Sequence, residues 1–212
     1  MADSSNESAR SSPVRRSQAQ RRQATMAAII EATITAIDEV GYSAATIQRI
    51  ADRAGVSTGA VFRHFPSRID LIAAAADEVG TRQIAVFRDL LPQDAAEIEQ
   101  PSIQLILEST RAIYRAPYGT FWDEINVHAR TDQHLRDRLK PAISKLRAAT
   151  DAVTNDVPGL ADLPARERRG LRNLAIAAFS MEARLAIADD DQFVGDELAE
   201  LLLRIARDHG MR

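Results

Sequence analysis

Residues 46–71 read TIQRIADRAGVSTGAVFRHFPSRIDL, and they hold the start and stop signals of two short helices in close succession. Thr46 can cap an amphipathic helix that Gly55 ends. Ser57 can cap a second helix, which Pro66 cannot continue because a proline has no backbone N–H to donate. Two short helices joined by a tight turn predict a helix-turn-helix, the geometry of many DNA-binding domains.

A longer helical pattern flanks this stretch on each side. Before it, from about Arg22 until Gly41, apolar residues recur at spacings of three and four: Ala27, Ile30, Ile34 and Ile37. After it, Ser67 with Asp70 resembles a capping box, with Asp in the place of the usual Glu or Gln. The helix that they open carries apolar residues along one side: Ile69, Ile72, Ala76 and Val79. No strand or hairpin signal appears in the sequence, so we predict an all-α fold.

One ordered run of residues matches a known family, and its members are Gly41, Tyr42, Thr46, Ile50, Ala51, Ala54, Gly55, Val56, Ser57, Gly59, His64, Phe65, Ser67 and Leu71. Over about residues 22–79 this run resembles the DNA-binding domain of the TetR family of bacterial repressors. The resemblance implies a three-helix DNA-binding domain at 22–79 and a larger helical domain at 80–212 that dimerises and binds a small effector. We expect residues 1–21 to be a flexible basic arm, because they are rich in Ser, Gln and Arg and poor in large apolar residues.

The second short helix offers several groups to DNA. Its N-terminus at Ser57 has free backbone N–H groups and the positive end of the helix dipole, so it can hold a phosphate. Gly59 has no side chain to keep the helix away from the DNA. We expect Thr58 and Arg63 to point outward and read base edges, since an Arg matches the O6 and N7 atoms of guanine.

The resemblance adds contacts with the DNA backbone. It implies that Thr46, His64 and Arg68 contact the backbone and position the protein without reading sequence. The usual Tyr of the family is Phe62 here, so its phosphate hydrogen bond is lost, and Phe62 is left to pack against a sugar or a thymine methyl. The alternative for Thr46 and Ser57 is that they serve only as helix caps.

Charge is uneven along the chain, although the net charge of its 212 residues is only −3. Residues 1–22 carry five Arg against two acidic residues, and residues 46–69 carry four Arg against Asp52 alone. Both segments are suited to a polyanion such as DNA, while residues 81–212 carry a net negative charge. The arm can reach into a minor groove or simply remain solvated charge.

Several other classes of protein lack support in the sequence. Cysteine is absent, which excludes disulfides, thiolate zinc sites and a cysteine nucleophile. No apolar run approaches the roughly 18 residues of a membrane span, and the polar first 25 residues hold no signal-peptide core, so we expect a cytoplasmic protein without a membrane partner. No phosphate-binding loop, nucleophile elbow or zinc motif is present, so we expect no catalysis, no metal and no cofactor.

Aromatic residues gather in one part of the larger half, where four of the ten in the chain are Tyr114, Tyr118, Phe121 and Trp122. Pro117 predicts a helix boundary near Ala116, with the aromatic rings meeting across it. We predict that these rings line the effector pocket, with Phe179 a weaker candidate on the same argument. The alternative is that they only fill the core.

Two polar residues follow this cluster. Glu124 and His128 stand at positions i and i+4, where they can add polar groups to an apolar pocket. The alternative is a pair on the surface. Aromatic lining favours a hydrophobic or planar effector.

Two apolar stripes near the C-terminus predict an antiparallel helix pair, and their residues are Leu171, Leu174, Ala178 and Leu185, then Leu198, Leu201, Leu202 and Ile205. Breaks are expected at 91–101, 155–164 and 189–195, and Pro141 should kink or interrupt the helix over 135–153. The last two helices suit a four-helix interface between two subunits. Such a homodimer would place its recognition helices about 34–36 Å apart, which requires a pseudo-palindromic operator in double-stranded DNA.

Together these observations predict a ligand-responsive, DNA-binding transcriptional regulator. The resemblance implies a repressor that a small effector releases from its operator, with the helix that starts at Ser67 as the lever between the two domains. The alternative is a DNA-binding regulator without an effector, either an activator or one controlled by a partner protein.

Overall fold

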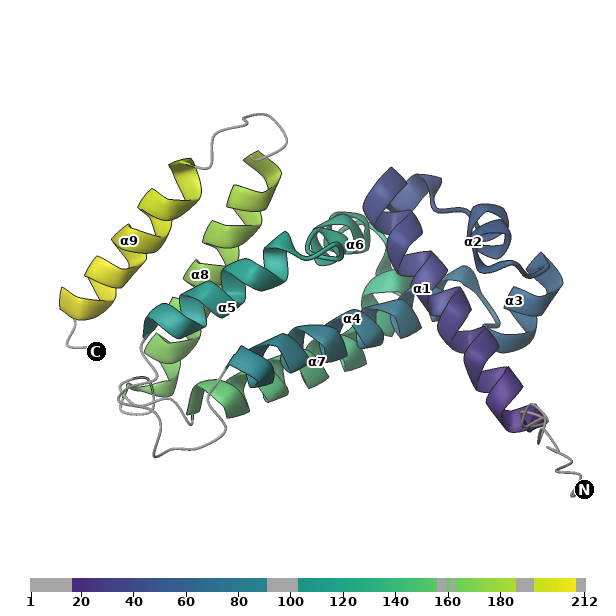
Figure 1. Cartoon of the computed structure of the whole chain (residues 1–212), viewed down its shortest axis with the longest axis horizontal. Helices are drawn as coiled ribbons and strands as arrows, with labels where there is room; N and C mark the ends of the chain where they lie inside the picture. The colour runs from purple at the N-terminus through teal and green to yellow at the C-terminus, as the bar shows by residue number, and fades with distance from the viewer. Residues whose placement is uncertain (1–16, 91–102, 156–159, 161–162, 186–192, 209–212) are drawn as a thin grey trace, which may run out of the picture.

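The computed structural model describes residues 17–90, 103–155, 160, 163–185 and 193–208. Within these ranges the chain forms nine α-helices and no strand, which confirms the predicted all-α fold. Figure 1 shows α1, α2 and α3 at one end of the molecule and α8 and α9 at the other, with α4 and α7 running between them. The helices are α1 (Gln18–Ala44), α2 (Ile47–Ala54), α3 (Thr58–His64), α4 (Arg68–Leu90), α5 (Ile103–Arg115), α6 (Phe121–Ala129), α7 (Gln133–Asn155), α8 (Ala165–Leu185) and α9 (Phe193–Asp208).

The first helix begins inside the segment that the sequence assigns to the arm. Ser17 forms a capping box with Gln20: its hydroxyl accepts the Gln20 N–H at 3.2 Å, and the Gln20 side chain accepts the Ser17 N–H at 2.8 Å. The helix therefore takes in residues 18–21, which the sequence pattern left in the flexible arm. The rest of the predicted arm, residues 1–16, lies outside the described residues.

A glycine turns the chain near the end of α1. Gly41 has a φ of +76°, in the left-handed region that side-chain-bearing residues rarely adopt. A Cβ atom at this position would also lie 3.1 Å from the Glu124 Oε2 atom of α6. The turn at Gly41 directs the last residues of α1, beginning with Tyr42, against α6.

The predicted caps of the helix-turn-helix are confirmed. The Thr46 side chain accepts the Arg49 N–H at 3.3 Å, and the Ser57 side chain accepts the Ala60 N–H at 3.2 Å. Gly55 ends α2 in the left-handed conformation, with a φ of +67°. These local bonds satisfy backbone groups that the helix ends leave free, which explains why two helices of eight and seven residues form here.

Two expected breaks in the larger half differ from the structure. Pro141 does not interrupt α7, which continues to Asn155. The turns around the proline carry the buried Leu135, Leu139 and Ala142, so their packing offsets the lost hydrogen bond. The last predicted break, 189–195, ends early because α9 begins at Phe193, while residues 186–192 lie outside the described residues.

The connection between α5 and α6 agrees with the sequence. The boundary predicted near Ala116 is confirmed, since α5 ends at Arg115 and α6 begins at Phe121. Gly119 packs so closely on the end of α5 that a Cβ atom there would lie 2.0 Å from the Tyr114 carbonyl oxygen. A glycine is required at this tight approach, which forms the turn between α5 and α6.

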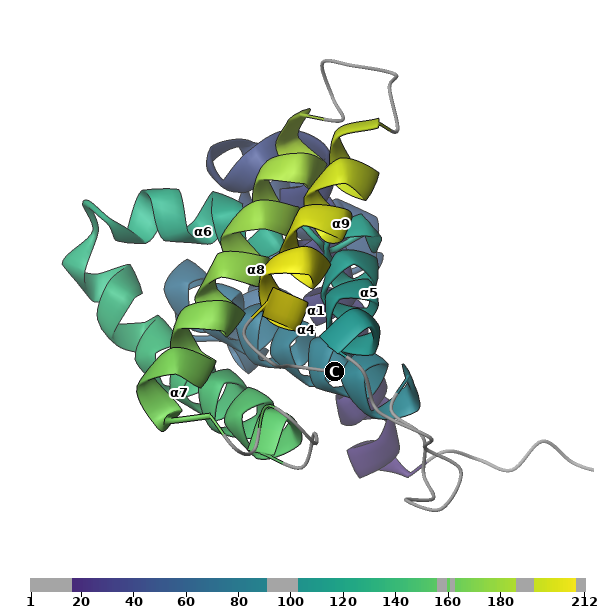
Figure 2. The ribbon, with the colours of Figure 1, turned by 90° about the vertical axis from the view of Figure 1, so that its left-hand side faces the viewer.

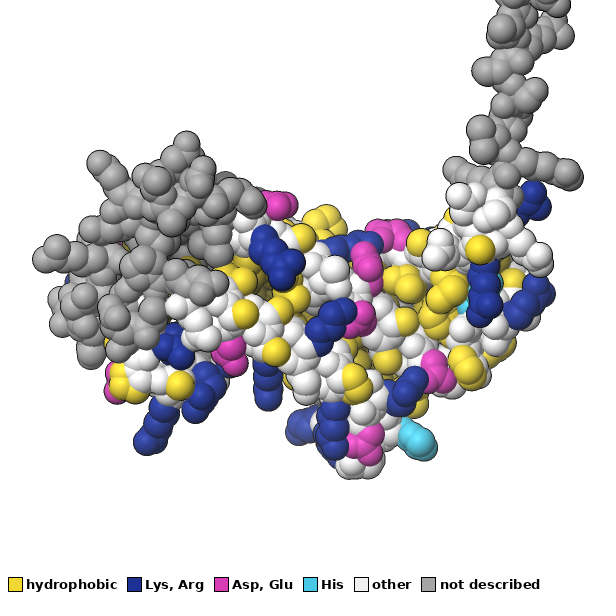
Figure 3. Space-filling model, turned by 90° about the horizontal axis from the view of Figure 1, so that it is seen from below, with side chains coloured by type: hydrophobic (Ala, Val, Ile, Leu, Met, Phe, Trp, Pro, Cys, Tyr) yellow, Lys and Arg dark blue, Asp and Glu magenta, His cyan; other side chains and the backbone are white. Residues whose placement is uncertain are grey.

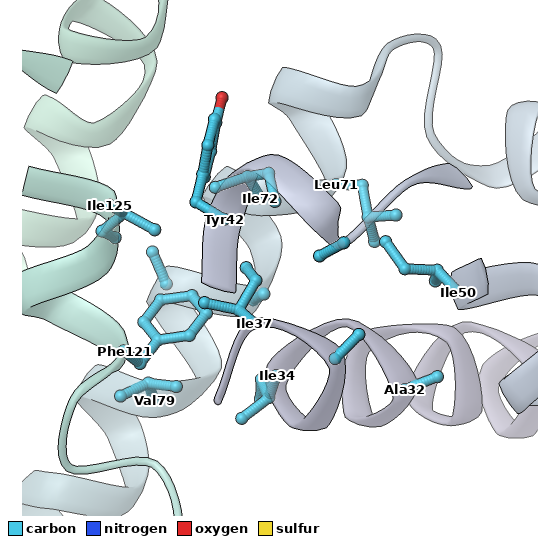
Figure 4. Close-up of a cluster of buried hydrophobic side chains, with 14 of the residues drawn as sticks. Ala32, Ile34, Ile37, Tyr42, Ile50, Leu71, Ile72, Val79, Phe121 and Ile125 are labelled. Carbon is cyan, nitrogen blue, oxygen red and sulfur yellow. The ribbon is translucent and has the colours of Figure 1, made fainter. Parts of the chain in front are cut away.

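Buried apolar side chains form a first core that joins α1, α2, α3 and α4 to α6 and α7. In Figure 4 Phe121 and Ile125 of α6 point toward side chains of α1 and α4, among them Ile37 and Val79. This core continues across the domain boundary that the sequence places at residues 79 and 80, and α4 itself runs through that boundary to Leu90.

A smaller second core joins α5, α8 and α9, and its buried residues are Ile106, Leu107, Leu160, Ala175, Phe179 and Leu202. Figure 2 shows α8 and α9 side by side, with α5 against them. Among the described helices, none combines the length and the apolar character that crossing a membrane requires.

Candidate DNA-binding surface and ligand cavity

The helix α3 lies on the outside of the first core and presents one face to solvent. Val61 is fully buried and packs α3 against the first core, whereas Phe62 is 49% exposed. Gly59 and Arg63 are exposed, and Thr58 is half-buried. Figure 3 shows Lys and Arg side chains on the end of the molecule that α1 and α3 form. The outer face of α3 therefore offers an aromatic ring and a guanidinium group at a basic end of the protein.

Three of the residues expected at DNA phosphates differ in exposure. Thr46 and Ser57 are exposed while their hydroxyl oxygens cap α2 and α3. Capping uses the oxygen as an acceptor, so each hydroxyl hydrogen can still be donated to a phosphate. His64 is half-buried at the end of α3, with its ring centre 6.5 Å from that of Phe65.

Arg68, which was also expected at the DNA backbone, reaches back across the protein. Its Nε atom donates to the Ala45 carbonyl at 3.3 Å, and its Nη2 atom donates to the Tyr42 carbonyl. The guanidinium carbon lies 4.1 Å from the centre of the Tyr42 ring. These contacts fasten the start of α4 to the end of α1, and α2 and α3 lie in the chain between these two points.

The end of α1 is also held by α6. The Tyr42 N–H donates to Glu124 Oε2 at 3.0 Å, and the His128 ring stacks on the Tyr42 ring with 4.3 Å between centres. The Ser43 hydroxyl and His128 Nε2 are 2.9 Å apart. Glu124 and His128, predicted as polar groups of the effector pocket, are thus placed at the contact between α6 and α1.

A cavity of about 320 Å³ opens among the helices α4 to α9. Its wall is mostly apolar and draws on α4 to α9, so it lies between the two cores. The described residues that line it are Gln83, Phe87, Ile106, Leu107, Thr110, Ile113, Tyr114, Trp122, Asn126, Ile143, Leu146, Arg147, Thr150, Leu160, Arg168, Leu171, Arg172, Asn173, Ala175, Ile176 and Leu202.

Two of the predicted effector residues line this cavity. Trp122 donates its indole N–H to the Gln83 side chain at 3.1 Å, in a buried bond that joins α6 to α4. Tyr114 lies on the wall at the end of α5, where burial raises the pKa of its phenol to about 12. The nearby Asp123 carboxylate acts in the same direction, and Arg184 opposes it.

The other predicted aromatic residues are placed elsewhere. Phe121 is fully buried in the first core, and Phe179 is buried in the second core with 1% of its surface exposed. Tyr118 is half-buried, with its ring centre 5.9 Å from the Arg82 guanidinium carbon. None of these three is among the described residues that line the cavity.

The two faces of α6 explain this division. Trp122 and Asn126 stand four positions apart and face the cavity. Phe121 and Ile125, one position earlier in each case, are fully buried in the first core. The sequence shows that the helix is apolar on more than one side, but it does not say which side meets a cavity.

The sequence pattern did not single out three basic residues of the cavity wall: Arg147, Arg168 and Arg172. Arg172 forms an ion pair with Asp151, and Arg168 donates to the Leu163 carbonyl at 2.9 Å. A signal was present, because Arg168 and Arg172 flank Leu171 on the predicted apolar stripe at a spacing of four. An Arg next to an inward-facing stripe is usually interpreted as an edge residue of the helix, so the pattern alone did not distinguish it.

Large apolar side chains remain exposed on the two C-terminal helices. Leu174, Ile176 and Met181 of α8 are 46%, 39% and 52% exposed, and Leu201 of α9 is 41% exposed. They belong to the helix pair that the sequence predicts as the dimer interface. Apolar surface concentrated in this way is typical of a protein–protein contact.

Comparisons with known proteins agree with this architecture. Residues 29–75 match the family model described as bacterial regulatory proteins of the tetR family. The chain is 36% identical over 149 residues to the uncharacterized HTH-type transcriptional regulator Rv2912c of Mycobacterium tuberculosis, which covers 70% of this chain and 75% of that protein.

Solved structures extend the likeness to the larger half. A TetR transcription regulator from Haloarcula marismortui is 25% identical and has a TM-score of 0.65, over 88% of this chain and 98% of that one. The regulator FadR from Bacillus subtilis, solved in complex with stearoyl-CoA, is 16% identical and has a TM-score of 0.60, over 84% of this chain and 96% of that one. The arrangement of the helices around the cavity is therefore shared with known transcriptional regulators.

Proposed function

Because the chain belongs to the TetR family of bacterial transcriptional regulators, we propose that it is a repressor whose hold on its operator is controlled by a small molecule in the cavity. The family membership makes it a DNA-binding regulator. The ligand response, the direction of regulation and the residues that carry each step are the proposal. It acts in the cytoplasm, where bacterial DNA lies, and it needs neither a cofactor nor a catalytic residue.

One observation carries the proposal: α6 touches both the cavity and the DNA-binding half. Trp122 and Asn126 line the cavity, while Glu124 and His128 on the same helix hold Tyr42 at the end of α1. A molecule that displaces Trp122 therefore moves a helix that is bonded to the DNA-binding half. A ligand changes operator affinity only if it binds one arrangement of the two halves better than the other.

The helix α4 provides a second connection. Gln83 and Phe87 line the cavity near its C-terminal end, and Arg68 at its first turn holds the end of α1. The bond from Trp122 to Gln83 ties α4 to α6, so both helices respond to the same occupant. In a dimer formed through α8 and α9, tilting α4 changes the distance between the two copies of α3.

On DNA, the outer face of α3 enters the major groove. Arg63 and Thr58 read base edges, Phe62 packs against a sugar or a thymine methyl, and Gly59 permits close approach. Thr46, Ser57 and His64 contact the backbone and fix the register. Arg68 contributes by positioning α4, in addition to any contact with a phosphate.

Selection of binding sites from a random duplex library tests the DNA-binding part of the proposal. The purified protein, used at two salt concentrations, should enrich a two-fold symmetric motif that survives the higher salt, because nonspecific binding weakens steeply with salt. Arg63→Ala should then cost about 1–3 kcal/mol of affinity and relax the preference at one base of each half-site. Retention of no symmetric motif would contradict a specific dimeric regulator, and unchanged specificity in Arg63→Ala would remove that residue from base reading.

A further inference from the structure

The charge of the cavity wall points to the class of molecule that it binds. Three arginines line the cavity, and no Asp or Glu is among its described lining residues. Most of the remaining wall is apolar, including Phe87, Leu146 and Leu171. An apolar space with positive charge on one part of its wall complements a molecule that has an apolar body and a negative group.

The arginines are concentrated where α7 and α8 meet. Arg172 is on the second turn of α8, and its ion pair with Asp151 brings it to the helix face of α7 that also carries Arg147, four positions before Asp151. Arg168 lies one turn before Arg172 on α8. All three therefore belong to the part of the wall that α7 and α8 form, whereas Trp122 belongs to the part that α6 forms.

Two of the arginines, Arg147 and Arg172, keep donors for a ligand. Arg147 is exposed, and its guanidinium makes no hydrogen bond or ion pair within the described part of the chain. The side chain of Arg172 is only 13% exposed, and the recorded pair with Asp151 uses its Nη1 atom. Because a guanidinium carries five N–H groups, other donors of Arg172 remain. Asp151 is 48% exposed at its side chain and does not line the cavity, so it anchors Arg172 without placing a negative charge on the wall.

We propose, building on the ligand response above, that the effector is a mainly apolar organic anion, such as a carboxylic acid, whose negative group binds Arg147 and Arg172 and whose apolar body extends toward Trp122. Arg168, which holds the chain around Leu160 and Leu163, supports the same positive wall. A neutral molecule of the same shape fills the apolar part but gives the Arg147 guanidinium no counter-charge. A cationic molecule is repelled.

Two fluorescent probes that differ only in an anionic group test this class. 8-Anilinonaphthalene-1-sulfonate and neutral N-phenyl-1-naphthylamine share one aromatic body, and each can be titrated into the full-length protein. Trp122, the single Trp of the chain, lines the cavity, so energy transfer from it reports binding at this site. We expect the sulfonate probe to bind about tenfold more tightly than the neutral one.

Substitutions then locate the preference. Arg147→Gln should weaken the sulfonate probe about tenfold and leave the neutral probe within about twofold. Arg169→Gln is the matched control, since Arg169 is exposed on α8 and is not in the described lining. Arg172→Lys keeps the positive charge and can still pair with Asp151. It should therefore lose less affinity for the sulfonate probe than Arg147→Gln does.

The outcomes separate this inference from the proposed function. Equal affinity for the two probes, or equal behaviour of Arg147→Gln and Arg169→Gln, overturns the anionic class while leaving a ligand cavity in place. Binding of neither probe, with no energy transfer from Trp122, overturns the ligand response itself. Displacement of the sulfonate probe by dodecanoate but not by dodecan-1-ol would extend the result from a sulfonate to a carboxylate.

Discussion

The two cores of this protein differ in how completely one chain buries them. The first core contains many side chains with no exposed surface, among them Ile37, Leu71 and Phe121. Among the described residues the second core has few buried members, and the helices that form it leave Leu174 and Met181 about half exposed. The first core is complete within one chain, whereas the second is suited to completion by another copy.

This difference separates two tasks. The first core holds the DNA-binding helices and α6 as one unit, so it gives α3 a fixed position. The second core borders the cavity and the exposed α8–α9 face, where a ligand and a partner have access. A less completely buried region is the easier one to rearrange. Four predictions test this contrast, beginning with the largest expected effect.

Truncating Phe121 should damage the first core most. This residue comes from the larger half of the sequence, yet it is fully buried among residues of the DNA-binding helices. We expect Phe121→Ala to lower the free energy of unfolding by about 3–5 kcal/mol, measured by urea denaturation at fixed protein concentration. Leu202→Ala in the second core is the comparison and should cost less. An equal or larger loss in Leu202→Ala would contradict the difference between the cores.

A charge on the exposed face of α8 should separate the subunits and leave each one folded. Met181 is 52% exposed, and Met181→Glu would place a carboxylate in an apolar interface. We expect the dimer dissociation constant to rise by about 100-fold or more, measured by sedimentation velocity, with unchanged circular dichroism. Val40→Glu is the matched control, because Val40 is 37% exposed on α1, which packs against α2, α4 and α6. If Met181→Glu dimerises as tightly as the wild type, the interface does not include this face of α8.

Alkaline titration should test whether water reaches Tyr114, which lies on the wall between the cavity and the second core. The pKa of the Tyr114 phenol is about 12 in the folded protein, above its ordinary value of 10, mainly because of burial. Below pH 10 both states hold the proton and the contribution of Tyr114 to stability is fully present. Between pH 10 and 12 the unfolded state loses the proton first, so stability falls, by on the order of 2 kcal/mol for this group.

Tyr114→Phe should not show the part of this stability loss that comes from ionisation of Tyr114. Its free energy of unfolding should fall less steeply between pH 10 and 12 than that of the wild type, and the phenolate absorbance at high pH should be smaller by the share of one of the three tyrosines. Parallel pH profiles for the two proteins would show that Tyr114 is hydrated and that the cavity wall is open to water.

Removing the charge of Glu124, at the contact between α6 and α1, should have the smallest effect on stability. Glu124→Gln keeps an acceptor for the Tyr42 N–H but removes the charge that strengthens the bond. We expect a loss of about 1 kcal/mol in the free energy of unfolding and a weaker response of operator binding to any cavity ligand. Glu200→Gln, on the exposed side of α9, serves as the control and should change neither quantity. Identical results for the two variants would show that the Glu124 contact does not couple the cavity to operator binding.

The sequence was most informative where a structural signal acts over a few residues. The caps at Thr46 and Ser57, the turn at Gly55 and the helix boundary before Pro117 all depend on backbone groups within about four positions. Each of these features could be predicted for that reason. At Pro141 the same argument predicts a kink or an interruption, and α7 is not interrupted there, because packing against distant residues of α4 outweighs the local cost of a proline.

The candidate site was predicted less completely, because its residues meet through long-range contacts. Trp122 and Tyr114 line the cavity, while Glu124 and His128 of the same sequence cluster hold α1 instead. Aromatic clustering indicates that side chains will be buried, but it does not distinguish a cavity wall from a filled core. Arg147 is on α7, whereas Arg168 and Arg172 are on α8, so the three arginines become neighbours only when these two helices pack.

The sequence by itself determined the all-α class, the helix-turn-helix and the family to which the chain belongs, since caps, turns and apolar periodicity are local properties of the backbone. The tertiary structure alone decided that α6 belongs to the first core, which of its faces meets the cavity, and that three arginines lie on one wall. These features depend on which helices pack together, and the free energy of that packing comes from contacts between residues far apart in the chain.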